Sequence, residues 1–216
     1  FDIGQVNITD PYYVNAFNKD LEYLLSLDPD RLLVGFKAVA DGRDPANTNL
    51  SALYGTTLYG GWEDGWSLLR GHTMGHYLTA LAQAYKQTKD NPILNEQIKD
   101  RLDYIVDGLK ESQDKSDNGY LFASLESHFD IIEGKAQGDT WVPWYTMHKL
   151  IQGLVDVYNY QGNETALQVA RRLGDWTYNR ASSWDSSTRT RVLNIEYGGM
   201  NDCLYELFKV TRDPKN

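Results

Sequence analysis

The sequence carries one helical segment three times, in the stretches YKQTKD (residues 85–90), YNYQGN (158–163) and FKVTRD (208–213). When these stretches are aligned, three leucines fall at one shared position: Leu81, Leu154 and Leu204. The first two copies continue into a second amphipathic helix, whereas the third reaches the last residue given before a partner helix begins. A repeated helix pair cannot bury its apolar face alone and packs against neighbouring pairs. The pattern therefore predicts an all-α chain of helical-hairpin repeats, as part of a larger stacked or closed ring.

Apolar periodicity and helix-capping residues predict the individual elements. Helices are expected at about 11–27, 67–88, 92–113, 143–160, 164–182 and 199–210. The segment from about 35 to 65 lacks periodicity and is rich in Gly, Asn, Asp and Tyr, which predicts a long loop. Residues 126–140 are expected to be irregular, 120–123 briefly extended, and 186–191 a short hairpin.

Composition excludes several classes of function. The net charge is −9 and no basic patch exists, so nucleic acid is not an expected partner. No apolar run approaches the roughly 18 residues of a membrane span, so no membrane association is expected. A single cysteine excludes an internal disulfide framework and leaves the compartment open. The chain has 15 Tyr and 6 Trp, many beside polar residues in connecting segments. Such rings suit the faces of sugars, although some of them simply fill gaps between helices.

The repeats also predict where a cleft lies, because equivalent positions fall at the same end of a stack. The first helix of each pair begins with polar, aromatic or glycine residues, whereas the opposite end carries plain turns. Helix N-termini present N–H groups that have no partner within the helix. The end at which these helices begin is therefore the predicted site.

Three histidines lie near this end. His72 and His76 have the i, i+4 spacing that places two imidazoles on one helix face, as metal sites require. No glutamate follows the first histidine and spacing indicates no third ligand, so contact with substrate or a structural role is favoured and no metal site is predicted. His148 is compatible both with substrate contact and with a hydrogen-bonded place in the core.

Glycoside hydrolysis commonly uses a pair of carboxylates. The candidates at the predicted site are Glu63, Glu196 and Asp202, and nothing in the sequence separates acid from base among them. Asp202 is equally explained as a charge that complements the dipole of the last helix. Cys203 occupies the repeat position of Ala80 and Gly153, which favours a place in the core over a reactive thiol.

Four motifs occur in a distinctive order: GGWE (60–63), GHTMGHYLTA (71–80), YTMHK (145–149, with Gly153 and Leu154) and GGMND (198–202). Together they resemble the N-terminal half of the catalytic domain of the β-L-arabinofuranosidase family. The resemblance implies an (α/α)6 barrel, about half of which would be formed by residues 1–216, truncated at its C-terminal end. It also implies release of L-arabinofuranose from plant-type glycans by the complete domain.

The resemblance implies substrate contact for seven residues: Trp62, Glu63, His72, His76, Tyr145, His148 and Asn201. The family's machinery, a zinc-bound cysteine nucleophile with a glutamate acid/base, is placed by the resemblance in the later half of the barrel. Cys203 does not match that nucleophile, and Asp202 stands where the family usually has Glu. No cofactor is therefore expected in this chain, zinc is expected only in a full-length enzyme, and the chain alone is expected to be inactive.

Alternatives remain at this point. The same toroid could carry another glycosidase or a sugar epimerase, and the chain could be a non-catalytic sugar-binding or helical-repeat interaction module. The expected partners are a carbohydrate and, over the last helix, the remainder of the catalytic domain or another copy. An exposed apolar face on that helix, including some of Leu204, Leu207 and Phe208, is the expected sign of such a partner.

Overall fold

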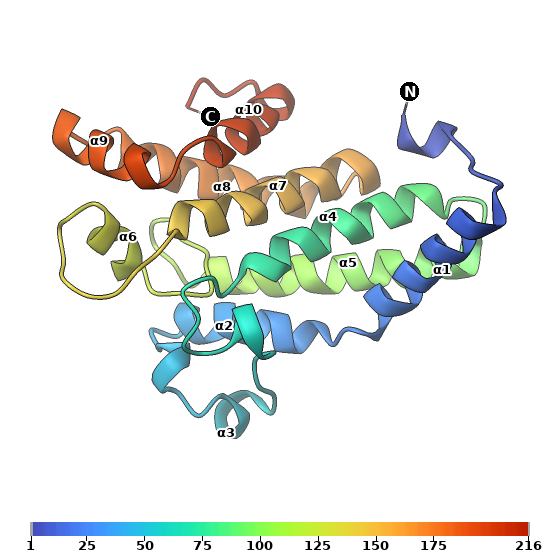
Figure 1. The fold of residues 1–216 in the computed structure, drawn as a ribbon, viewed down its shortest axis with the longest axis horizontal. Helices are drawn as coiled ribbons and strands as arrows, with labels where there is room; N and C mark the ends of the chain where they lie inside the picture. Colours follow the sequence, from blue (N-terminus) through green and yellow to red (C-terminus); the bar gives the residue numbers. More distant parts are fainter. Residues whose placement is uncertain (1, 216) are drawn as a thin grey trace.

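The computed structural model describes residues 2–215, and the described residues form helices, turns and loops without any strand (Figure 1). The α-helices are α1 (Pro11–Ser26), α2 (Pro29–Ala40), α3 (Leu50–Tyr54), α4 (His72–Gln87), α5 (Pro92–Gln113), α6 (Ser127–Ile132), α7 (Pro143–Gln161), α8 (Glu164–Ala181), α9 (Ser186–Ile195) and α10 (Gly199–Thr211). Three short 3-10 helices accompany them: η1 (Ile3–Gln5), η2 (Pro45–Asn47) and η3 (Gly61–Glu63). The all-α prediction is confirmed.

Three helices that start the repeats, α4, α7 and α10, lie side by side and run in the same direction (Figure 1). Two contacts show that α4 and α7 are parallel. Gly75 lies against Lys149, and further along both helices the Thr79 hydroxyl donates to Asp156 over 2.7 Å. Gly199, the first residue of α10, lies against His148 in the N-terminal half of α7. All three helices therefore begin at one end of the molecule, which we call the site end.

A second set of helices, α2, α5 and α8, packs against this first set and against itself. α5 runs antiparallel to α4, since Asn95 donates to the Tyr85 carbonyl over 2.6 Å and Arg101 donates to the Tyr77 hydroxyl over 3.2 Å. The core between the sets is apolar and fully buried. It includes Met74, Leu78, Leu81, Ile98, Leu102, Ile105, Leu109, Met147, Leu150 and Leu154.

The contact between α4 and α7 is closer than side chains would allow. A Cβ added to Gly75 would lie 2.1 Å from the backbone of Lys149, and one added to Gly153 would lie 2.6 Å from the Gly75 carbonyl oxygen. Glycine is required at both positions because the obstacle in each case is backbone, which cannot move aside as a flexible side chain could. The two backbones are thereby held in direct contact near the site end.

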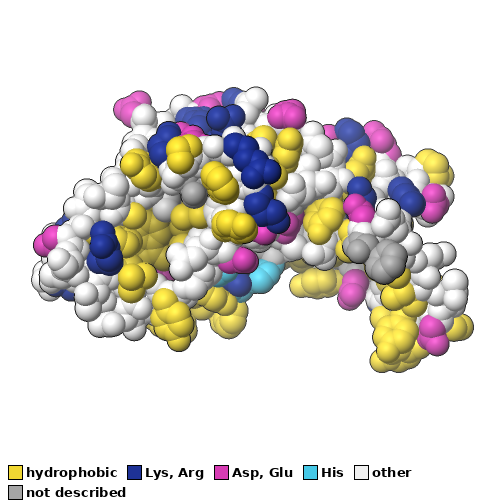
Figure 2. Space-filling model, turned by 90° about the horizontal axis from the view of Figure 1, so that it is seen from above, with side chains coloured by type: hydrophobic (Ala, Val, Ile, Leu, Met, Phe, Trp, Pro, Cys, Tyr) yellow, Lys and Arg dark blue, Asp and Glu magenta, His cyan; other side chains and the backbone are white. Residues whose placement is uncertain are grey.

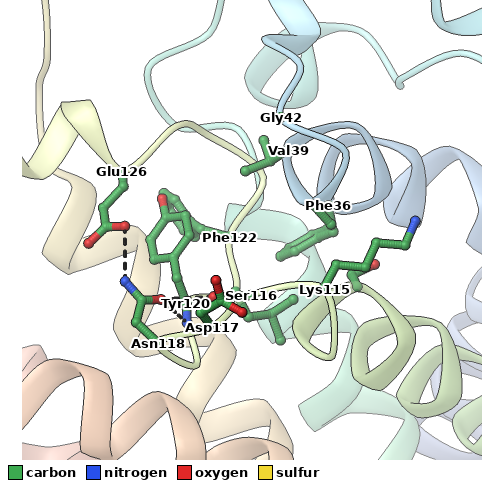
Figure 3. Close-up of a pocket in the computed structure, with 13 residues that line it drawn as sticks. Phe36, Val39, Gly42, Lys115, Ser116, Asp117, Asn118, Tyr120, Phe122 and Glu126 are labelled. Carbon is green, nitrogen blue, oxygen red and sulfur yellow. Dashed lines mark hydrogen bonds between the residues drawn. The ribbon is translucent and has the colours of Figure 1, made fainter.

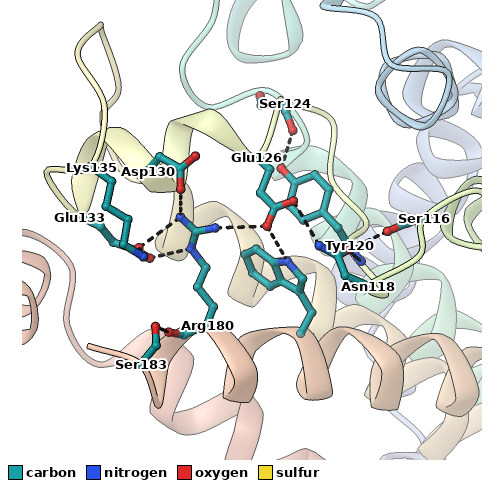
Figure 4. Close-up of polar contacts among 11 residues, drawn as sticks. Ser116, Asn118, Tyr120, Ser124, Glu126, Asp130, Glu133, Lys135, Arg180 and Ser183 are labelled. Carbon is teal, nitrogen blue, oxygen red and sulfur yellow. Dashed lines mark hydrogen bonds and ion pairs between the residues drawn. The ribbon is translucent and has the colours of Figure 1, made fainter. Parts of the chain in front are cut away.

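A buried ion-pair cluster anchors α6 and the connection before α7 (Figure 4). Arg180 of α8 donates to Glu133 over 2.6 Å, to Glu126 over 3.1 Å, and also to Asp130. Glu126 additionally accepts the indole N–H of Trp176 over 3.0 Å. Glu133 is buried and also pairs with the Lys135 ammonium over 2.6 Å, so two cations compensate its charge.

Three predictions about local structure were wrong. The expected loop from 35 to 65 contains the end of α2 and all of α3. Five consecutive residues of α2, 32–36, are buried, and the charged residues Asp30, Arg31 and Lys37 form its polar side. The expected hairpin at 186–191 belongs to α9, which is capped by Asp185 on the Thr188 N–H, and α6 lies within the segment expected to be irregular.

The expectation of an apolar face on the last helix holds only in part. Leu207 is 0% exposed, packed within this chain, and Leu204 and Phe208 are half-buried, whereas Tyr205 is 62% exposed. Cys203 is buried, as predicted. Among the described residues, no helix combines the length and the apolar character that crossing a membrane needs.

The close helix contact makes a stability prediction. Gly75→Ala is expected to lower the free energy of unfolding by about 3 kcal/mol or more, because the new methyl group overlaps backbone atoms of α7. Gly60→Ala is the matched control, since Gly60 has φ −79° and nothing lies within 4 Å of a Cβ added there. That control should change stability by less than about 0.5 kcal/mol. Equal denaturant midpoints for the two variants would contradict the proposed contact.

Candidate functional site

The first turns of α4 and α7 receive their caps from glutamates elsewhere in the chain. Neither helix has a side-chain cap from its own N-cap residue, Gly71 or Val142. Glu63 accepts the N–H groups of Gly71 and Thr73, each over 2.7 Å, and so uses both carboxylate oxygens. Glu196 accepts the N–H of Tyr145 over 2.8 Å with its Oε2. These two carboxylates fix the starts of the helices that carry the predicted site residues.

Five of the predicted residues form one connected cluster at the site end. The ring of His72 lies 5.1 Å from that of Trp62, 4.6 Å from that of His76 and 5.6 Å from that of Tyr145, measured between centroids. The Tyr145 ring in turn lies 5.2 Å from the ring of His148. We call these five residues the histidine cluster. Of the residues expected to converge at this end, four lie together here: Trp62, His72, Tyr145 and His148. His76 joins them, whereas Asn201, the fifth residue of that expectation, makes none of these ring contacts.

Glycine also shapes the boundary between this cluster and α10. A Cβ on Gly199 would lie 2.5 Å from the Cε1 and Nδ1 atoms of His148. The preceding residue, Gly198, has φ +93°, a backbone conformation that residues other than glycine rarely adopt. The Gly-Gly pair therefore lets the start of α10 approach the His148 ring directly.

The imidazoles of the histidine cluster are neutral near pH 7. Burial, with smaller effects of His76 and Lys149, lowers the pKa of His72 to about 4. Burial, followed by Lys149, likewise lowers the pKa of His148 to about 4, and the pKa of His76 is lowered for the same two reasons. Within the described part of the chain, the Nε2 atom of His72 is buried without a hydrogen-bond partner. A neutral imidazole can both donate and accept, which suits hydroxyl groups.

Glu196 has a different environment from Glu63. Burial raises the pKa of Glu196 to about 7, although the backbone N–H groups at the start of α7 partly oppose this. Its Oε1 atom is buried and has no hydrogen-bond partner in residues 2–215. Of the three candidate carboxylates, Glu63 has both oxygens occupied and Asp202 is exposed in the first turn of α10. Glu196 is therefore the one of these three carboxylates that has a buried oxygen without a hydrogen-bond partner among the described residues.

A pocket of about 140 Å³ adjoins the histidine cluster and shares Tyr145 with it. It lies between the start of α7, the end of α9 and the start of α10. Its lining residues are Val142, Trp144, Tyr145, Leu193, Ile195, Glu196, Tyr197, Gly198, Gly199, Met200 and Asn201. Asn201, predicted as a substrate contact, is thus placed beside the cluster in this adjoining pocket, which we call the α10 pocket.

The surface around the site end is mixed in character. Figure 2 shows a histidine side chain at the concave edge of one face, next to dark blue Lys or Arg and magenta Asp or Glu side chains. A separate pocket of about 340 Å³ lies at the C-terminal ends of α2 and α5 (Figure 3). There the Oδ1 of Asn118 accepts hydrogen bonds from the Ser116 hydroxyl over 2.8 Å and from the Tyr120 N–H over 3.0 Å. The Nδ2 of Asn118 donates to Glu126 over 3.3 Å. Its polar groups satisfy one another, so it is a weaker candidate.

Two further residues belong to the site although they were not predicted. The Lys149 ammonium lies 4.7 Å from the centroid of the Tyr145 ring, a distance typical of cation–π contact. Trp144 lines the α10 pocket and packs on Trp176 with a centroid separation of 5.6 Å. Lys149 shares a repeat position with His76, and this equivalence could have indicated it.

The described residues do not fit a zinc site. No group of three or more His, Cys, Asp or Glu side chains in residues 2–215 is arranged to hold a metal ion. Burial raises the pKa of the Cys203 thiol, which disfavours the thiolate that binds metals. Zinc in a longer protein stays a prediction from the sequence resemblance, and no chemical step of this chain is derived through it.

Comparison with known families identifies one match. Residues 5–216 match the family described as Beta-L-arabinofuranosidase, GH127 catalytic domain. The match covers nearly the whole chain, including all four motifs and both glutamate caps. A search of curated proteins found no match.

The buried carboxyl of Glu196 makes a prediction about pH. Because its folded-state pKa is raised from 4.5 to about 7, the stability that it contributes is fully present below pH 4.5 and is lost as the pH rises through 7. Glu196→Gln removes this loss. Between pH 5 and pH 8, the free energy of unfolding of the variant should therefore rise by about 3 kcal/mol relative to that of the wild type.

Denaturant unfolding at several pH values measures this difference. The lowered pKa values of His72 and His148 act with the opposite sign, favouring stability as the pH rises from about 4 to 6.5, but they are common to both proteins and cancel. A difference that stays constant with pH would show that Glu196 is ionised at low pH in the folded state.

Proposed function

We propose, from the premise that this chain belongs to the β-L-arabinofuranosidase catalytic-domain family of glycoside hydrolases, that its histidine cluster binds an L-arabinofuranosyl ring of a glycan. Membership of this family makes carbohydrate the substrate class. The finer assignment, to L-arabinofuranose in plant-type glycans, is the proposal.

The observation that carries the proposal is the set of neutral imidazoles beside aromatic rings. A sugar hydroxyl needs a partner that can donate and accept, and the neutral rings of His72 and His148 provide both. The unpartnered Nε2 of His72 is a buried polar atom that a ligand hydroxyl would satisfy. Charged partners would hold an ionised ligand better than a neutral sugar, and here the imidazoles are uncharged.

The exposed aromatic residues complete the surface for a sugar ring. Trp62 and Tyr145 both remain exposed while contacting His72. Their faces can cover the C–H patches of a sugar, while the imidazoles take its hydroxyls. Lys149, held over the Tyr145 ring, adds an N–H donor at the same edge.

The chemical step is not assigned to the three predicted carboxylates. A glycosidase pair needs two carboxyl groups about 5–9.5 Å apart with oxygens free to act. Glu63 is occupied as a helix cap by two backbone N–H groups, which leaves it a structural role. We therefore propose that this chain supplies substrate recognition, and that hydrolysis by the natural enzyme uses groups other than Glu63.

A second candidate, a sugar-binding module without hydrolysis, is favoured by the use of Glu63 as a helix cap, which removes one of the three candidate carboxylates from chemistry. The two functions are separated by an assay of the natural full-length protein on an aryl β-L-arabinofuranoside, with and without a chelator. Turnover supports the hydrolase, whereas binding without turnover supports the module.

Binding itself is tested on the chain with methyl β-L-arabinofuranoside, which is locked as a furanose. Calorimetric titration should show saturable binding, and His72→Ala should weaken it about tenfold or more, since a hydrogen-bond partner and a ring contact are both lost. His128→Ala is the control, because His128 lies in α6 and makes no ring contact with the histidine cluster. Equal losses in the two variants, or tighter binding of the matching glucopyranoside, would contradict the proposal.

A further inference from the structure

Arg70 is a buried cation that lies two residues before α4 begins, and the histidine cluster does not include it. The residue is 3% exposed. Burial lowers the pKa of its guanidinium, and the carboxylates of Asp44 and Glu63 oppose this change. Burying a charged group costs free energy unless its polar atoms are paired. The hydrogen-bond partners of Arg70 therefore show which parts of the chain this side chain holds.

The guanidinium of Arg70 joins two segments of different character. Its Nε donates to the Ala123 carbonyl over 2.6 Å, and one Nη donates to the Ser124 hydroxyl over 3.3 Å. The other Nη donates to the Gly65 carbonyl. Residues 120–124 are all buried, whereas most of the loop that contains Gly65 is exposed. Arg70 thus ties an exposed loop to a buried segment.

The loop of residues 60–66 carries Trp62 and has little packing of its own. A Cβ added to Gly60 or to Gly61 would meet nothing within 4 Å. Trp62 is 60% exposed, although its ring lies 5.1 Å from the ring of His72 between centroids. Apolar burial therefore contributes little to keeping this ring in the histidine cluster.

Polar anchors hold the loop instead. Glu63, the residue after Trp62, caps the first turn of α4. Arg70 holds the carbonyl of Gly65 and also lies 4.0 Å from the carboxylate of Asp44, the N-cap of η2. The place of Trp62 thus depends on one anion and one cation, neither of which belongs to the histidine cluster.

The shape of the Arg70 side chain matters as well as its charge. A guanidinium has its N–H donors in a fixed plane and can serve acceptors in different directions. Arg70 uses all three of its side-chain nitrogens in this way. A lysine has one nitrogen in their place. Arg70→Lys therefore keeps the cation beside Glu63 and Asp44 but weakens the link between the two segments.

We infer that Arg70 is a positioning residue for sugar binding, which holds loop 60–66 against the buried segment 120–124 and thereby keeps the Trp62 ring beside His72. The acceptors of its guanidinium all lie outside the histidine cluster. This inference rests on the proposed function, because it needs a sugar at that cluster. It adds that the affinity for the sugar depends on a buried side chain that acts through Trp62.

A double-mutant cycle tests whether Arg70 acts through Trp62. The probe is methyl β-L-arabinofuranoside, titrated by calorimetry well below the unfolding midpoint of every variant. Trp62→Ala is expected to weaken binding about tenfold, and Arg70→Lys about fivefold. Because both changes affect the same ring, the double variant should bind about tenfold more weakly than the wild type. Independent effects would instead multiply to about fiftyfold.

A measurement without sugar checks the geometry by itself. The Trp62 ring stands edge-on to the His72 ring, with 84° between their planes, so loss of this contact changes the ring-current shift of the His72 Cε1–H signal in NMR spectra. In Arg70→Lys this signal should move in the same direction as in Trp62→Ala. His72→Ala identifies the signal among those of the 4 histidines. A signal that moves in Trp62→Ala but keeps its wild-type position in Arg70→Lys would reject the inference.

Arg101→Lys is the matched control. Arg101 also links segments through main-chain carbonyls, those of Leu25 and Leu27, and it donates to the Tyr77 hydroxyl over 3.2 Å. None of these acceptors belongs to the histidine cluster or to loop 60–66. The control should lower the unfolding midpoint but change the sugar affinity by less than about twofold.

The outcomes separate this inference from the proposed function. Equal sugar affinity in Arg70→Lys and the wild type, or a double variant weakened about fiftyfold, would overturn the inference and leave the proposed function standing. Absence of saturable binding by the wild type would overturn both. If Arg70→Lys does not fold, Ser124→Ala takes its place in the cycle, because it removes one acceptor and keeps the guanidinium. Its expected loss is about threefold, and unchanged affinity would reject the inference.

Discussion

The direct backbone contact of α4 with α7 determines the geometry of the site end. Gly75 and Gly153 bring the two helices so close that backbone meets backbone. At this spacing the side chains that start the helices cannot avoid one another, and the His72 and Tyr145 rings stack at 5.6 Å between centroids. Larger residues at either position would push the helices apart and separate the rings. The arrangement of the histidine cluster thus depends on glycine at positions 75 and 153.

The imported glutamate caps provide the second constraint, because they set the direction of each helix start. Glu63 reaches α4 from η3, and Glu196 reaches α7 from the end of α9. Both carboxylates are buried, so leaving either one without hydrogen-bond partners would cost more free energy than it would for an exposed carboxylate. The same residue type serves two purposes here. Both oxygens of Glu63 accept backbone N–H groups, whereas one oxygen of Glu196 is buried without a hydrogen-bond partner among the described residues.

The repeat pattern was sufficient to predict the parallel course of α4, α7 and α10 and the meeting of their first turns at one end. It did not predict α2, which lies outside the repeats and begins directly after the turn that ends α1. It could not predict α9 either, in which Val192 alone is buried and β-branched residues imitate a strand. The role of Glu63 was also out of reach. Capping by a residue outside the helix depends on the folded arrangement, and the motif that contains Glu63 equally suits a ligand contact.

The long chain separation between Glu196 and the helix that it caps has a consequence for biosynthesis. The bond from the Tyr145 N–H joins residues 51 positions apart. On the ribosome, α7 and its partner α8 can emerge and pair well before residue 196 has been made. During that interval the first turn of α7 lacks the carboxylate that accepts the Tyr145 N–H. The cap on the first turn of α7 is therefore completed late in translation, after α4, α7 and α8 have been synthesised.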